Sequence, residues 1–219
     1  MLHKIIALFC VFALAGCASV ESPSSSPATP QAVQIPKDAI CHLVQKGQTL
    51  WRISKIYNVD IDDIARINRL PDDSSISTGQ NLIIPSATKT NFTSQNYADF
   101  IWPVKGTVVT RFKQKNSGVL SKGVDISTDS QADIVAAREG TVSFIGTLPG
   151  YGETLIIDHK DGLSSVYCGI TSIQVKTGDT IEQGKTIAKA GQSPRSNASM
   201  IHFEIRKKHR PQNPLFYLD

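Results

Sequence analysis

The sequence has no apolar run long enough to cross a bilayer as a helix. Its N-terminal apolar stretch covers only residues 5–15, whereas a membrane-spanning helix needs about 20 apolar residues. A stretch of this shorter length, preceded by Lys4 and followed by small residues, is typical of the core of a secretory signal peptide. The sequence therefore predicts that the chain is exported, with residues 1–16 as its signal peptide.

A large excess of charge of one sign is also missing. The 23 lysines and arginines exceed the 19 aspartates and glutamates only slightly, which gives a net charge of +4. This excess suits a surface near anionic wall polymers or lipid headgroups, and it does not single out nucleic acid. The basic run at residues 206–210 has no interleaved aromatic residue, so we interpret it as a solvated strand end and expect no nucleic-acid partner.

Cysteine is scarce, with four in the whole chain. Cys10 lies in the predicted signal peptide, and Cys17 ends the run LAGC at residues 14–17, which resembles the lipobox of bacterial lipoproteins. The resemblance implies cleavage before Cys17 and attachment of lipid to its thiol, and two or more acyl chains anchor a protein firmly. Cys41 and Cys168 remain, and a disulfide bond between them is an open alternative in an oxidising periplasm.

Residues 17–40 are predicted to form a tether. Their composition turns to Ser, Pro, Ala and Thr after Cys17, and such segments bury too little apolar surface to fold. Cys17 is followed by Ala18 and Ser19 and not by an aspartate. By the lipoprotein resemblance, this favours the outer membrane. We therefore expect a lipid anchor on the periplasmic face of that membrane.

Residues 41–86 are predicted to form a small βααβ domain. Apolar residues recur at helical spacing after Thr49 and again after Asp60, and both residues are plausible N-caps. Short apolar strands flank the two helices at residues 42–44 and 82–85. The runs VQKGQTLWRIS at residues 44–54 and TGQNLIIP at residues 78–85 make this segment resemble a LysM domain over its full length.

The LysM resemblance implies binding to glycan strands of peptidoglycan that contain N-acetylglucosamine. Backbone amides near a glycine can approach acetamido groups closely, and small polar side chains suit sugar hydroxyls. A single domain with few polar anchors should bind weakly. For Leu50 and Ile76 a place in the core is an equally open alternative. The groove-lining residues that the resemblance implies are Gly47, Gln48, Thr49, Leu50, Ser75, Ile76, Ser77 and Thr78.

The rest of the chain is predicted to be all-β. Residues 87–99, rich in Thr, Ser, Asn and Gln, read as a second linker. From residue 100 onward short strand patterns alternate with turn signals, which favours a two-sheet antiparallel sandwich over residues 100–219. The fold class predicted for the whole chain is therefore α+β, a βααβ domain followed by an all-β sandwich.

Several blocks in the predicted sandwich resemble the lysostaphin/LytM family of zinc endopeptidases. They are WPV at residues 102–104, KGVDI at residues 122–126, GYG at residues 150–152 and HFEIR at residues 202–206. The resemblance implies the family's LytM fold. It also implies a pattern for the metal site: a histidine four residues before an aspartate, a Tyr-x-His block and a His-x-His pair.

The sequence departs from this metal-site pattern at three positions. Ser121 precedes Asp125 by four residues, Gly169 replaces the histidine of the Tyr-x-His block, and Met200 replaces the first histidine of the pair that ends in His202. A catalytic zinc needs three protein ligands, and a thioether cannot shuttle protons. We therefore predict no cofactor and no catalytic residue, with Asp125 and His202 as a vestigial hydrogen-bonded pair. His159 and His209 are expected to be solvated.

A LysM domain before such a LytM domain on a lipoprotein resembles the NlpD-type division factors. The resemblance implies a non-enzyme that activates a periplasmic zinc N-acetylmuramoyl-L-alanine amidase during separation of daughter cells. Two alternatives stay open, a structural tether between wall and membrane and a residual endopeptidase. Tyrosine, methionine and arginine are common in protein interfaces, and the residues expected to line a partner groove are Lys122, Asp125, Tyr151, Tyr167, Met200, His202 and Arg206. Ordinary packing in the sandwich is the open alternative for these residues, more so for Tyr167 than for Tyr151, which lies in a glycine-flanked loop.

Overall fold

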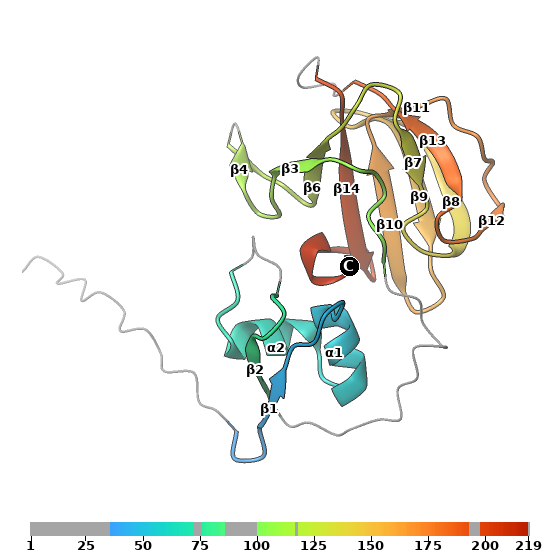
Figure 1. The fold of residues 1–219 in the computed structure, drawn as a ribbon. Coiled ribbons are helices and arrows are strands. Elements are labelled where there is room, and N and C mark those ends of the chain that lie inside the picture. The colour runs from blue at the N-terminus through green and yellow to red at the C-terminus, as the bar shows by residue number, and fades with distance from the viewer. Residues whose placement is uncertain (1–35, 72–75, 86–99, 117, 193–197, 219) are drawn as a thin grey trace, which may run out of the picture. The chain divides into compact units, whose positions relative to one another are not determined.

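The computed structural model describes residues 36–71, 76–85, 100–116, 118–192 and 198–218 (Figure 1). The predicted signal peptide, Cys17, Ser75 and the linker at residues 87–99 lie outside these ranges. Over the ranges that are described, no helix is both long enough and apolar enough to span a membrane.

The N-terminal part of the described chain is the expected βααβ unit. Strand β1 (Ile40–Leu43) pairs antiparallel with β2 (Asn81–Ile84), and helices α1 (Leu50–Tyr57) and α2 (Ile61–Ile67) lie between them in the chain. Both predicted N-caps are confirmed, because Thr49 Oγ1 accepts from the Arg52 N–H and Asp60 Oδ1 accepts from the Asp62 N–H.

Asn68 joins the second helix to the second strand. Its side-chain amide donates to the carbonyls of Ile64 and Ile83 at 2.8 and 2.7 Å, and its Oδ1 accepts from the Ile83 N–H at 2.7 Å. These bonds satisfy backbone groups at the helix end and along β2. The two loops that precede α1 and β2 are also bonded to each other, from Val44 N to Gln80 O and from Gly79 N to Val44 O.

The C-terminal part is built of antiparallel strands in two main sheets, which confirms the predicted sandwich and the α+β class. The larger sheet has the order β12-β8-β9-β10-β14-β6-β3, with β15 paired to β14, and the smaller has the order β11-β13-β7. Strands β4 and β5 form a separate hairpin. Their bounds are β3 Thr107–Thr110, β4 Lys115–Asn116, β5 Val119–Leu120, β6 Val124–Ser127, β7 Asp133–Val135, β8 Gly140–Leu148, β9 Gly152–Asp158, β10 Leu163–Cys168, β11 Ile170–Thr171, β12 Thr180–Ile181, β13 Thr186–Ala190, β14 Met200–Lys207 and β15 Arg210–Gln212, and a 3-10 helix follows at Pro214–Phe216.

Strand β14 lies between β6 and β10 in the larger sheet (Figure 1). Its side chains alternate in direction, as in any strand. Ile201, Phe203 and Ile205 are fully buried in the core. His202, Glu204 and Arg206 therefore share the opposite face, and this face carries the residues of the candidate site.

Candidate functional site

Register between three neighbouring strands brings the predicted site residues together. His202 on β14 is paired with Asp125 on β6 and with Cys168 on β10. His202 Nδ1 lies 2.6 Å from Asp125 Oδ1, with both side chains about six-sevenths buried, at 14% and 16% exposure. The hydrogen-bonded pair that the sequence suggested is thus present.

The other nitrogen of His202 faces a second carboxylate. Nε2 lies 3.2 Å from Glu204 Oε1, and Arg206 Nε donates to Glu204 Oε2 at 2.6 Å. We define Asp125, His202, Glu204 and Arg206 as the charge network. When His202 carries both ring protons, the carboxylates of Asp125 and Glu204 face two cationic groups, the His202 ring and the Arg206 guanidinium. Each ring nitrogen of His202 then donates to a carboxylate oxygen.

The pKa values of the charge network follow from these contacts. Burial lowers the pKa of His202, but its hydrogen bonds to Asp125 and Glu204 outweigh burial and bring that pKa above the usual histidine value. Burial likewise raises the pKa of Glu204, yet hydrogen bonds with His202 and Arg206 bring it below the usual glutamate value. Both shifts favour the ionised forms, so the network is a set of mutually compensated charges.

The donor set does not fit a catalytic zinc ion. The Ser121 hydroxyl donates to the Gly123 carbonyl at 2.9 Å, which keeps it in a local turn. Gly169 has no side chain, and a Cβ placed there would lie 3.1 Å from the Met200 carbonyl oxygen. Both ring nitrogens of His202 are already bonded to carboxylates. The described ranges hold no group of three or more His, Cys, Asp or Glu side chains arranged for a metal.

Other predicted groove residues lie around the charge network. The Tyr151 ring is half-buried, and its centroid is 5.5 Å from that of His202. Met200 is half-buried at the start of β14, the Arg206 side chain is 30% exposed, and Lys122 is exposed just before β6. These side chains are accessible at least in part, as a recognition surface requires.

Tyr167 does not belong to this surface. It is fully buried, its Oη accepts from the Ala137 N–H at 2.8 Å, and it is hydrogen-bonded to Ser165 at 3.0 Å. Burial raises the pKa of Tyr167 to about 12. The expectation that Tyr167 lines a partner groove is therefore wrong in this structure, because strand β10 is buried on both faces near its end.

The structure answers the open question of the Cys41–Cys168 disulfide and contradicts the expectation that His159 is solvated. Cys41 is exposed and Cys168 buried, and neither forms a disulfide bond. Burial raises the pKa of the Cys168 thiol to about 12, so it is a poor nucleophile. His159 is buried rather than solvated, with Nδ1 2.6 Å from the Glu139 carbonyl and Nε2 3.0 Å from Ser165 Oγ.

The predicted glycan loops divide into structural and accessible residues. Thr49 and Leu50 are buried, the first as helix cap and the second in the core, so their side chains do not face a ligand. Gln48 Oε1 accepts from the Gln45 N–H and lies 2.8 Å from His42 Nε2. The remaining loop residues are half-buried or exposed, namely Gly47, Ile76, Ser77 and Thr78.

Comparison with known families assigns both folded parts. Residues 42–85 match the LysM domain, and residues 119–214 match peptidase family M23. The chain combines a LysM domain with a peptidase family M23 domain. The family name M23 describes the fold and ancestry of the second domain, whereas its chemistry depends on the residues described above.

Two curated relatives cover different shares of the chain. The uncharacterized lipoprotein YgeR of Escherichia coli K12 is 26% identical over 204 residues, which are 81% of this chain and 80% of that protein. The murein hydrolase activator NlpD of Salmonella dublin is 36% identical over 135 residues, 61% of this chain. That match spans only 35% of the activator's own length.

Two solved structures resemble the M23 domain. A chain of the SpoIIQ–SpoIIIAH pore forming complex is 29% identical, with a TM-score of 0.51 over 55% of this chain and 91% of that chain. A zinc containing peptidase from Vibrio cholerae is 26% identical, with a TM-score of 0.50 over 54% of this chain and 40% of that chain. One fold thus occurs both in a zinc peptidase and in a protein–protein complex.

Proposed function

We propose that this protein is a non-catalytic, peptidoglycan-binding envelope lipoprotein that activates a periplasmic N-acetylmuramoyl-L-alanine amidase during separation of daughter cells. The observation that carries the proposal is the charge network. His202 is bonded to Asp125 at 2.6 Å and to Glu204 at 3.2 Å. With Ser121, Gly169 and Met200 at the other positions of the metal-site pattern, Asp125 and His202 supply fewer than the three protein ligands that a catalytic zinc needs, so in this proposal the M23 groove recognises a partner and does not cut.

The relatives support an activating role. NlpD of Salmonella dublin is named a murein hydrolase activator, and a related M23-type domain is part of the SpoIIQ–SpoIIIAH complex. The accessible aromatic and cationic side chains beside the network are of the types that carry binding energy in interfaces. In this proposal Lys122, Tyr151, Met200 and Arg206 contact the amidase.

The remainder of the chain would place this activity at the wall. Residues 41–86 bind glycan through the accessible loop residues, residues 1–16 are a cleaved signal peptide, and residues 87–99 join the two domains. Lipid on Cys17, followed by the tether to residue 40, anchors the protein to the outer membrane. The name lipoprotein of the Escherichia coli relative supports a membrane-anchored envelope protein.

The test measures the amidase rate on purified sacculi with the full chain in detergent. We expect the chain to raise the rate, and we expect Tyr151→Ala and Arg206→Ala to lose most of that increase. Arg210→Ala is the matched control, because Arg210 is exposed and outside the charge network. No rate increase, or equal activation by all three variants, would contradict the proposal.

A further inference from the structure

The hairpin of β4 and β5 projects from the M23 domain, away from its two main sheets (Figure 1). It carries two neighbouring apolar side chains that are largely exposed, Val119 at 62% and Leu120 at 56%. Single exposed apolar residues need no explanation, whereas exposed apolar residues that gather at one place mark contact surfaces. The proposed amidase contact and the glycan loops use neither of these two residues.

Hydrogen bonds at the base of the hairpin fix its shape. The Lys113 N–H donates to the Ser121 carbonyl at 2.9 Å, and the Ser121 N–H donates to the Gln114 carbonyl at 3.0 Å. The Gln114 side-chain oxygen also accepts from the Arg111 N–H at 2.8 Å. A hairpin that is already ordered loses little conformational entropy when it binds, so its exposed side chains are prepared for contact.

Cross-strand pairing places a lysine beside the exposed leucine. Lys115 is paired with Leu120, and Asn116 with Val119. Residues directly opposite each other in an antiparallel pair share one face, and the Lys115 side chain is exposed. A lysine can lay its alkyl chain along an apolar surface while its ammonium stays in a polar phase. The hairpin therefore presents an apolar group and a cation side by side.

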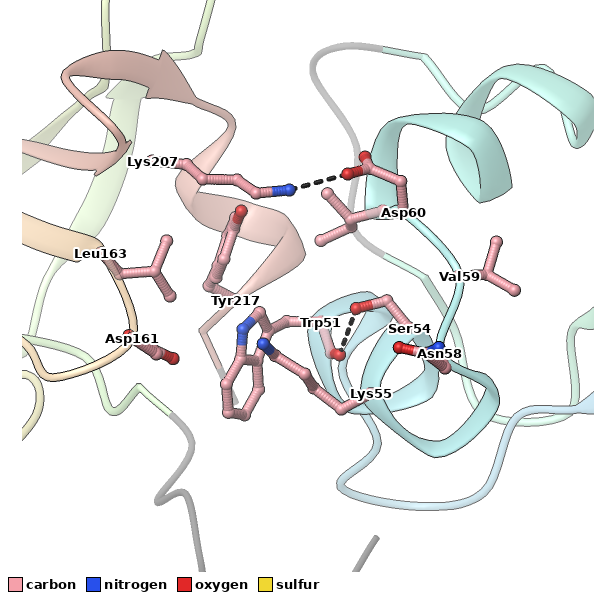
Figure 2. A pocket seen from close by; sticks show the side chains of 11 residues that line it. Trp51, Ser54, Lys55, Asn58, Val59, Asp60, Asp161, Leu163, Lys207 and Tyr217 are labelled. Carbon is pink, nitrogen blue, oxygen red and sulfur yellow. Dashed lines mark hydrogen bonds and ion pairs between the residues drawn. The ribbon is translucent and has the colours of Figure 1, made fainter. Parts of the chain in front are cut away.

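The charges around the hairpin are of one sign. Residues 104–124 contain five lysines and arginines and no aspartate or glutamate. Four of these cations lie at residues 111–122, and all four are exposed. Helix α1 of the LysM domain differs, because three aspartates follow Lys55 within eight residues, the first of them Asp60 (Figure 2). The hairpin segment alone carries a charge of +4, as large as the net charge of the whole chain.

The size and composition of the hairpin favour a bilayer over a protein as its partner. Stable protein interfaces bury about 800 Å² on each side, and they are depleted in lysine, which supplies three of the four cations here. A bilayer surface needs no matching shape. Binding to it grows with the apolar area inserted and with the attraction of cations to anionic headgroups, and this hairpin offers both.

We propose that the β4–β5 hairpin docks the M23 domain on an anionic phospholipid bilayer. Val119 and Leu120 enter the boundary between headgroups and acyl chains, and Lys113 and Lys115 lie at the phosphate groups. The lipid anchor of the proposed function supplies only proximity to the bilayer. Amidase activation is not involved, so either proposal can fail without the other.

The test follows the fluorescence of a Leu120→Trp variant of the full chain in vesicles. One set of vesicles mixes brominated phosphatidylcholine with phosphatidylglycerol, and the other contains brominated phosphatidylcholine alone. Bromine quenches an indole that reaches the acyl chains, and the parent chain gives the background from Trp51 and Trp102. We expect additional quenching only with phosphatidylglycerol, and its loss at high salt because salt screens the attraction.

Three outcomes of this measurement overturn the proposal. They are no additional quenching, equal quenching in both sets of vesicles, and quenching or a spectral shift that requires an added amidase in place of phosphatidylglycerol. Val119→Trp gives the same measurement if Leu120→Trp fails to fold. Flotation of the chain with the vesicles made of phosphatidylcholine alone tests the lipid anchor separately, and a chain that is not anchored still reaches the anionic vesicles from solution.

Further substitutions in the Leu120→Trp chain locate the contact. Lys115→Gln should lower the ratio of docked to undocked chain roughly fivefold, because one basic residue contributes about 1 kcal/mol near an anionic surface. Val119→Ser should lower it roughly fivefold or more, since less apolar area enters the bilayer. Lys176→Gln removes the same charge from an exposed lysine outside the hairpin and should change nothing. Unchanged quenching in both Lys115→Gln and Val119→Ser overturns the proposal.

Discussion

Nδ1 of His202 lies 2.6 Å from Oδ1 of Asp125, so the histidine and the aspartate that remain of the family's metal-site pattern bind each other. Glu204 occupies the second nitrogen of the ring and is itself held by Arg206. The consequence is a set of four charged groups that satisfy one another inside a peptidase fold. The proposed recognition of an amidase uses this surface and needs no metal.

Glu204→Gln should destabilise the M23 domain. The side chain of Glu204 is 1% exposed and bonded to both His202 and Arg206, so the neutral amide leaves two neighbouring cations less compensated. We expect a loss of about 1–3 kcal/mol in the free energy of unfolding, measured with denaturant. Glu153→Gln is the control at an exposed site on β9, and an equal effect of both changes would argue against the network.

The stability of the fold should fall between about pH 6.5 and pH 4. Burial lowers the pKa of His159 from 6.5 to about 4. Between these two pH values the histidine is protonated in the unfolded chain and neutral in the folded chain. Linkage then makes unfolding more favourable as the pH falls, by roughly 3 kcal/mol in total. Chemical denaturation at each pH measures this loss.

A histidine elsewhere provides the control for this pH dependence. His209 is exposed, so His209→Gln should leave the slope of stability against pH unchanged, whereas His159→Gln should flatten it. A slope that persists in His159→Gln would assign the acid sensitivity to other groups.

Substitutions in the LysM loops should affect either the stability of the domain or its binding to glycan, depending on whether the residue is buried or exposed. Thr49→Ala removes the N-cap of α1 and should cost about 1 kcal/mol of stability. Ser77→Ala and Thr78→Ala, at exposed loop positions, should weaken binding to sacculi with little change in unfolding. Co-sedimentation with sacculi and thermal unfolding of the same samples test this, and undiminished sedimentation of the Ser77 and Thr78 variants would place the glycan elsewhere.

Structural features that depend on a local sequence pattern were predicted correctly. The caps Thr49 and Asp60 stand directly before helical apolar spacing, and the structure places both as N-caps. The pairing of Asp125 with His202 followed from the motif. Glu204 was missed as a partner, although the alternation of His202, Glu204 and Arg206 along one strand already put three charged groups on one face.

Burial that depends on distant contacts could not be read from the sequence. Tyr167 lies on a strand whose end is covered on both faces, so period-two alternation gives no sign of which side it faces. His159 sits in a hairpin turn, where exposure is the usual outcome, yet its ring packs at 5.1 Å against that of Phe100, almost sixty positions earlier in the chain.

Mass spectrometry of the products released from purified sacculi tests the central claim most directly. In buffer with added zinc, we expect the full chain alone to release no fragments from the sacculi. Together with the cognate amidase, the chain should increase the release of intact peptides from the glycan above the level that the amidase gives by itself. Release of fragments with newly cut peptide crosslinks by the chain alone would contradict the account and show that the M23 domain is a working endopeptidase.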